Sequence, residues 1–223
     1  ISNTSISCTS LPAGRFSVAS LSVYVQRIVC ISSWILFLIG ELSFNLSAAN
    51  YYWVGGSGNW TDINHWRTTS GGSALPSVIP GPTDNVFFDA KSGFTAASKT
   101  ITIDNTANCH NITFSGSVVA PMLTQSGNQT LNIYGSSEWQ TDMGTISVNN
   151  IYYRHTGEAK TIKTNGVKLG TANSNIYFEE ENTISLLDNY KIGYELYHQA
   201  GTWITNNNDV IIYGRFYANS GTK

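Results

Sequence analysis

Aromatic stacking is the chemistry that this sequence offers most plainly. The stretch YYWVGGSGNWTDINHW, residues 51–66, brings together Trp53, Trp60 and Trp66 with several glycines between them. Indole rings stack on sugar rings when at least two of them are exposed and nearly coplanar, which makes these residues candidates for glycan stacking. The same large apolar side chains would also close the end of a stacked β fold, with the glycines allowing sharp bends. We expect the cap and keep glycan stacking as the alternative.

Carboxylates occur at two places where chemistry is conceivable. Glu179, Glu180 and Glu181 form the only acidic run, and paired carboxylates on adjacent coils can do acid–base work on polysaccharides. No second cluster lies one coil away in the sequence, which favours a solvated strand end. Asp84 and Asp89 fall short of a calcium loop, which needs about six to eight oxygens, so we expect Asp84 to accept backbone N–H bonds in a turn.

Histidine and cysteine provide no recognisable catalytic or metal pattern. The four histidines are widely separated, and none has a second His or Cys at metal-ligand spacing. Cys109 and His110 are adjacent and would point to opposite sides of a strand, so we expect Cys109 to be a small buried hydrophobic residue. No nucleophile elbow and no phosphate-binding glycine loop is present. These patterns predict a protein that is not an enzyme and that uses no cofactor and no metal.

The N-terminal segment has the pattern of a secretory leader. Arg27 precedes an uncharged apolar run, residues 28–40, and Ser47-Ala48-Ala49 offers small residues for cleavage near Ala49. Glu41 ends the run before it reaches the roughly twenty residues of a membrane span. We therefore expect a signal peptide at 24–49, no membrane span in the mature chain, and a possible non-native upstream segment at 1–23.

Charge and composition fit a secreted β-rich protein. Only 12% of the residues are charged and the formal net charge is −2, with the basic residues scattered along the chain. Binding to nucleic acid needs clustered Lys and Arg, so we expect no nucleic-acid partner.

Short β-branched and aromatic runs, separated by Gly, Asn, Asp and Ser, follow from residue 99 onward and predict an all-β fold. TLNIYGSSEW (130–139) resembles DVIIYGRFYA (209–218), and TIKTNGVKLG (161–170) resembles TWITNNNDVII (202–212). Loose self-similarity suggests a β-solenoid, like a right-handed parallel β-helix, although a β-sandwich would fit the strand spacing. The Thr-Asn corners favour the solenoid, because stacked coils form Asn ladders and need residues that tolerate the left-handed region. We expect a cap region at 50–98 and coils at 99–223, cut short at the C-terminus.

The opening motif, with SGGSALPSVIPGPTDNVFFDA (70–90) and LNIYGS (131–136) after it, resembles the N-terminal region of very large secreted surface proteins of the Bacteroidota. The resemblance implies a β-helix-like, adhesin-like protein of the cell surface, exported by type IX secretion.

These observations predict a secreted or cell-surface, adhesin-like structural protein that is not catalytic. The alternative is a carbohydrate-binding or carbohydrate-cleaving β-helix, which holds surface glycans by the tryptophans or by a row of tyrosines, namely Tyr152, Tyr177, Tyr197 and Tyr213. A third option, an ice-binding face, would need regular Thr-x-Thr ranks, which the sequence does not show.

Overall fold

The computed structural model describes residues 48–219 except 145, 155 and 180–182. The predicted upstream segment and nearly all of the predicted signal peptide lie outside the described residues, as do Glu180 and Glu181. The described residues all belong to one compact unit, Ser47–Lys223.

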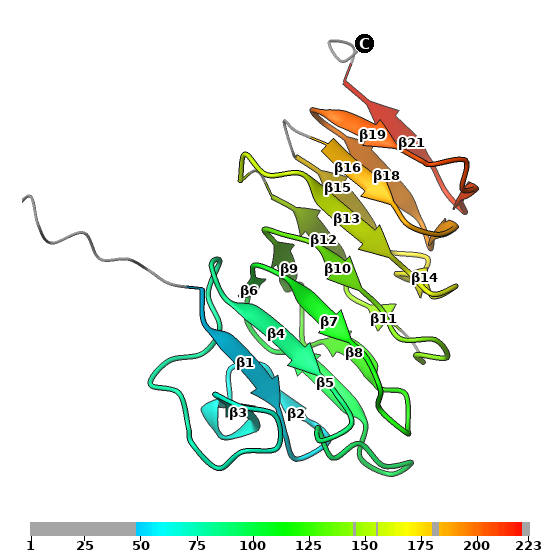
Figure 1. The fold of residues 1–223 in the computed structure, drawn as a ribbon. Helices are drawn as coiled ribbons and strands as arrows, with labels where there is room; N and C mark the ends of the chain where they lie inside the picture. The colour runs from blue at the N-terminus through cyan, green and yellow to red at the C-terminus, as the bar shows by residue number, and fades with distance from the viewer. Residues whose placement is uncertain (1–47, 145, 155, 180–182, 220–223) are drawn as a thin grey trace, which may run out of the picture. The chain divides into compact units, whose positions relative to one another are not determined.

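The described chain winds through stacked coils whose strands form parallel sheets along the stack (Figure 1). Sheet 1 contains β1 (Asn50–Trp53), β4 (Asn85–Phe88), β7 (Ile112–Phe114), β10 (Ser137–Glu138), β13 (Lys160–Lys163), β16 (Thr183–Leu186) and β19 (Thr202–Ile204), with β3 (Trp66–Arg67) at its edge. Sheet 2 contains β2 (Gly58–Asn59), β5 (Thr100–Ile103), β8 (Met122–Gln125) and β11 (Ile146–Ser147). Sheet 3 contains β14 (Lys168–Leu169), β17 (Tyr190–Ile192) and β20 (Val210–Ile212). Sheet 4 contains β6 (Ala107–Cys109), β9 (Thr130–Ile133), β12 (Asn150–Tyr153), β15 (Asn175–Phe178), β18 (Glu195–His198) and β21 (Phe216–Ala218).

This arrangement confirms the β-solenoid and excludes the sandwich. Every strand pairing between coils is parallel, and the one antiparallel pair among the named strands joins β3 to β1. The described residues contain no α-helix, only the 3₁₀ turn η1 (Ile63–His65). Parallel pairing between successive coils already includes β1, β2 and β4, so the stack begins within residues 50–98.

Alternation along each strand explains why these segments stack. In β4, Val86 and Phe88 are buried while Asn85 and Phe87 lie on the outer surface, and β12 and β15 repeat the pattern. Because the coils are in register, the buried residues of one coil pack against the buried residues of the next coil. Each coil therefore buries its apolar side chains only by contact with the coils before and after it.

Asparagine ladders and left-handed corners also appear as the sequence predicts. The Asn85 amide donates to Asn50 Oδ1 at 3.0 Å, and the Asn111 amide donates to Asn85 Oδ1 at 2.7 Å. At the Thr-Asn corners, Asn165 and Asn206 adopt φ values of 49° and 53°, in the left-handed region that Asn tolerates. The similarity of 161–170 to 202–212 is therefore structural, since both segments run from sheet 1 into sheet 3.

The other internal similarity is misleading. TLNIYGSSEW contains β9 of sheet 4 and β10 of sheet 1, whereas DVIIYGRFYA contains β20 of sheet 3 and β21 of sheet 4. The two segments therefore occupy different sides of the coil. Their likeness reflects a shared strand–Gly–strand corner, which occurs at more than one side of the solenoid.

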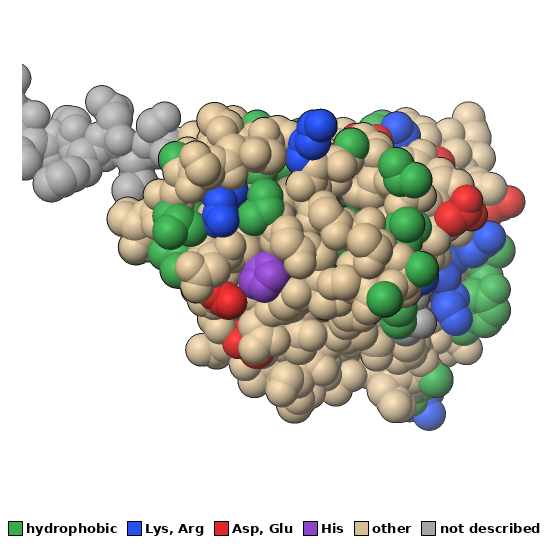
Figure 2. Space-filling view, turned by 90° about the horizontal axis from the view of Figure 1, so that it is seen from below, with side chains coloured by type: hydrophobic (Ala, Val, Ile, Leu, Met, Phe, Trp, Pro, Cys, Tyr) green, Lys and Arg blue, Asp and Glu red, His purple; other side chains and the backbone are tan. Residues whose placement is uncertain are grey.

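The aromatic N-terminal cap is confirmed. Strand β3 pairs with β1 at the outer edge of sheet 1, and Trp66 packs edge to face against Trp53 with ring centroids 5.0 Å apart. The Trp53 N–H donates to the Gly56 carbonyl at 2.7 Å, which satisfies the indole inside the apolar cluster. Gly58 is required here, because a Cβ at this position would lie 2.0 Å from His65 Nε2. Viewed from this end, the surface carries hydrophobic side chains only in small separate groups (Figure 2).

Candidate functional site

The three tryptophans are not a glycan-stacking surface. Trp53, Trp60 and Trp66 each have 0% of their surface exposed. They pack on one another and on Phe88, so no indole face is available to a sugar ring. The alternative interpretation of these residues is therefore corrected, and the reason is that all three indoles point into the core at the end of the stack.

A row of stacked tyrosines does lie on the outer surface of sheet 4. Tyr152, Tyr177, Tyr197 and Tyr217 occupy one register position in four successive strands. Their ring centroids are 4.1, 4.7 and 4.6 Å apart in order along the row, and each neighbouring pair is nearly parallel. Tyr217 takes the place that the sequence assigned to Tyr213, which follows β20 on another side and lies near Lys168.

Charged side chains cover and border this tyrosine row. The Arg154 guanidinium lies 4.0 Å from the centroid of Tyr152 and forms an ion pair with Glu179. The Tyr197 hydroxyl donates to the buried Glu195 carboxylate at 2.6 Å, and this bond is the main reason that the pKa of Tyr197 is raised. Glu179 directly follows the end of β15, as we expected, and its partly exposed carboxylate forms this ion pair between coils. Since each inner ring is sandwiched by its neighbours, the row exposes ring edges and hydroxyls but few ring faces.

The remaining candidate residues have structural surroundings. Asp84 accepts from the Gly81 N–H at 2.9 Å and from the Ala49 N–H at 3.1 Å, as the turn interpretation predicts. Asp89 accepts from the Lys91 N–H at 2.8 Å. Cys109 is fully buried, which confirms it as a small hydrophobic residue, and burial raises its pKa. Among the described residues, no three His, Cys, Asp or Glu side chains converge as metal ligands.

A different group of outer side chains on sheet 1 forms a shallow hollow that the sequence did not reveal. Tyr52 and Phe87 stack on neighbouring strands, with ring centroids 4.9 Å apart and planes 17° apart. Thr113 follows in register on β7, and Glu138 follows on β10. The hollow beside these residues has a volume of about 340 Å³. We call it the Phe87 groove and define it by Phe87, Thr113, Glu138 and Lys163.

The polar side of the Phe87 groove is an ion pair between coils. Lys163 Nζ lies 2.8 Å from Glu138 Oε1, and both side chains are about 40% exposed. The Glu138 carboxylate is the main cause of the raised pKa of Lys163. The groove therefore places an aromatic ring at one end, a small threonine in the middle and a neutralised pair of charges at the other end.

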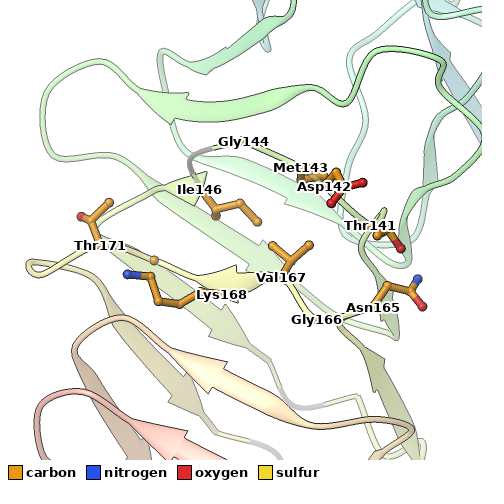
Figure 3. Close-up of a pocket in the computed structure, with 11 residues that line it drawn as sticks. Thr141, Asp142, Met143, Gly144, Ile146, Asn165, Gly166, Val167, Lys168 and Thr171 are labelled. Atoms are coloured by element: carbon orange, nitrogen blue, oxygen red, sulfur yellow. The ribbon is translucent and has the colours of Figure 1, made fainter.

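A larger hollow, of about 740 Å³, lies where the solenoid changes its coil shape (Figure 3). β10 ends at Glu138 and β11 begins at Ile146, whereas β13 ends at Lys163 and β14 begins already at Lys168. The shorter corner displaces β14 from β11, so sheets 2 and 3 remain separate and a corner hollow forms between them. Its lining includes Asp142, Asn165 and Lys168 but no aromatic side chain.

Comparison of the chain with protein-family models, curated proteins and solved structures gave no match. Among the described residues, no helix has the length and apolar character needed to cross a membrane.

Proposed function

We propose that this chain is part of a secreted, cell-surface, adhesin-like protein whose solenoid presents binding surfaces and does no catalysis. The observation that carries the proposal is the use of carboxylates to tie coils together. Asp188 accepts from the backbone N–H of Thr164 at 2.8 Å, and Asp104 accepts from that of Thr61 at 3.1 Å, each from one coil to the next. Glu138 and Glu179 pair with Lys163 and Arg154 of neighbouring coils.

These bonds favour a rigid extended scaffold. A carboxylate that is committed to an ion pair or to backbone donors is already satisfied and is poorly suited to exchange protons with a substrate. The leader-like pattern at 24–49 and the resemblance of residues 51–90 to secreted Bacteroidota surface proteins support export and type IX secretion. The neutral polar surface fits contact with surface glycans or other cell-surface components.

Surface location is tested on intact cells of the organism that encodes the chain. We expect proteinase K, added outside, to degrade the full-length protein, while a cytoplasmic marker in the same cells stays intact. Sequencing of the exported protein should find an N-terminus near Asn50. A chain that keeps residues 24–49 and is protected until the cells are lysed would contradict export.

The absence of catalysis is tested separately with the purified secreted protein. We expect no new reducing ends and no unsaturated uronate after incubation with a panel of neutral and acidic polysaccharides. Release of either product, lost on Glu138→Gln or Glu195→Gln substitution, would establish the carbohydrate-cleaving alternative.

A further inference from the structure

The Phe87 groove is an interrupted aromatic stack. On sheet 4, tyrosines occupy the same outer position in four successive strands, and the ring stack is continuous. On sheet 1, Tyr52 and Phe87 begin an equivalent stack, but the next outer position in register is Thr113. A small side chain therefore stands where a third ring would lie, and the hollow of about 340 Å³ opens there.

The ring geometry leaves one face of Phe87 directed toward this hollow. Tyr52 covers the opposite face, at 4.9 Å between centroids, so the free face looks along the stack toward Thr113 and Glu138. Neighbouring strands are about 4.8 Å apart. The gap over Thr113 thus accepts a flat ligand one ring thick, which would lie parallel to Phe87 and continue the stack.

The chemistry at the other end of the groove selects a neutral hydroxylated ligand. Glu138 can accept hydrogen bonds from hydroxyl groups and Lys163 can donate to them, while their mutual pairing at 2.8 Å leaves no net charge to attract an anion or a cation. The aromatic face attracts the polarised C–H groups of a saturated ring because the π face is negative. A pyranose has both features, a C–H face and a rim of hydroxyls.

We propose that the Phe87 groove binds a neutral saccharide, with one pyranose ring stacked on Phe87 over Thr113 and its hydroxyls on Glu138 and Lys163. This inference rests on the proposed function, since it names the ligand class that an adhesin-like solenoid of this kind would hold. It assigns binding to the outer face of sheet 1, opposite to the inner face on which Trp53 and Trp66 are buried, and not to the tyrosine row on sheet 4.

The test uses the full secreted chain and four neutral hexasaccharides, namely cellohexaose, maltohexaose, xylohexaose and chitohexaose, with hexagalacturonate as the charged comparison. Affinity is measured by titration calorimetry. We expect at least one neutral hexasaccharide to bind. Thr113→Tyr should fill the gap with a third ring and weaken binding at least tenfold without lowering the melting temperature, and Phe87→Ala should weaken it similarly.

Matched variants separate the groove from general effects on folding. Thr113→Ser keeps the gap and should bind within about twofold of the unchanged protein, while Tyr177→Ala disturbs only the other stack and should also keep its affinity. The proposal is overturned if no neutral hexasaccharide binds, if only hexagalacturonate binds, or if Thr113→Tyr binds as well as Thr113→Ser. Surface location of the protein, measured on intact cells, is unaffected by any of these outcomes, so a failure here is distinct from a failure of the proposed function.

Discussion

Tyr177 lies face to face on Tyr152, with ring centroids 4.1 Å apart and planes 7° apart, although the two residues belong to different coils. The relationship exists because Asn150–Tyr153 and Asn175–Phe178 pair in parallel without a shift in register. A shift of one residue in either strand would turn the tyrosine of that strand into the interior. The tyrosine row therefore reports the register of sheet 4 from β12 to β21.

Removing a ring from the middle of the tyrosine row should destabilise the solenoid. Tyr177 stacks on Tyr152 and on Tyr197, and each such contact contributes about 0.5–1.5 kcal/mol beyond area burial. We expect Tyr177→Ala to lower the free energy of unfolding by about 1–3 kcal/mol, and Tyr177→Phe to cost much less because it keeps both stacks. Urea denaturation followed by circular dichroism measures this difference. Equal losses for the two variants would assign the effect to the hydroxyl group instead of the ring.

Asp188 should be among the most important polar side chains at the corners. Its carboxylate accepts from the N–H and the hydroxyl of Thr164 and from the N–H of Asn165 in the preceding coil. We expect Asp188→Ala to cost about 1–3 kcal/mol, because it leaves the buried N–H of Thr164 without a partner, while the Thr164 hydroxyl can still donate to the Asn189 carbonyl. Asp209→Ala, at an exposed position in a later corner, should change stability by less than about 0.5 kcal/mol. The idea fails if both variants unfold at the same urea concentration.

Cys109 should resist thiol reagents as long as the protein is folded. The side chain has 0% exposure, and burial raises the pKa of its thiol, so very little thiolate is accessible at neutral pH. We expect iodoacetamide to leave Cys109 unlabelled in native protein and to label it fully in guanidinium chloride. Peptide mass spectrometry locates the label. Rapid native labelling of the peptide that contains Cys109 would show that this part of β6 opens readily.

His198 should make stability depend on pH near neutrality. It lies near Trp203, and burial lowers its pKa below the ordinary value of 6.5. As the pH falls, His198 therefore takes up a proton in the unfolded chain at a higher pH than in the folded chain, which favours unfolding. The stability that neutral His198 contributes is present above about pH 6.5 and is lost at lower pH. We expect the melting temperature to drop between pH 8 and pH 5, and to drop less in His198→Phe. An identical drop in both proteins would place the titration elsewhere.

Local sequence patterns were sufficient to predict the class of fold. Alternating β-branched residues, Asn corners and the buried core positions follow from the preferences of single strands and turns. The glycines and tryptophans of 51–66 also predicted a cap, because so much aromatic surface at one end requires burial.

The functional surfaces depend on register, which the sequence does not display. Tyr213 was predicted to belong to the tyrosine row, but β20 and β21 lie on different sides of the coil and Tyr217 takes the position. Coil length varies, with residues bonded between neighbouring coils 20 apart at Asn189 and Asp209 but 26 apart at Asn85 and Asn111. The steps from Tyr52 to Phe87, from Phe87 to Thr113 and from Thr113 to Glu138 are 35, 26 and 25 residues. No fixed period therefore aligns these four positions, and the Phe87 groove is recognisable only when the strands are paired.

The most direct test of the account is to locate a bound neutral hexasaccharide by backbone amide chemical shifts. We predict that titration moves the amide signals of Phe87, Thr113 and Glu138 most strongly and leaves those of Tyr152, Tyr177 and Tyr197 nearly unchanged. Shifts centred on the tyrosine row, or no shifts at saturating saccharide, would contradict the assignment of binding to the Phe87 groove.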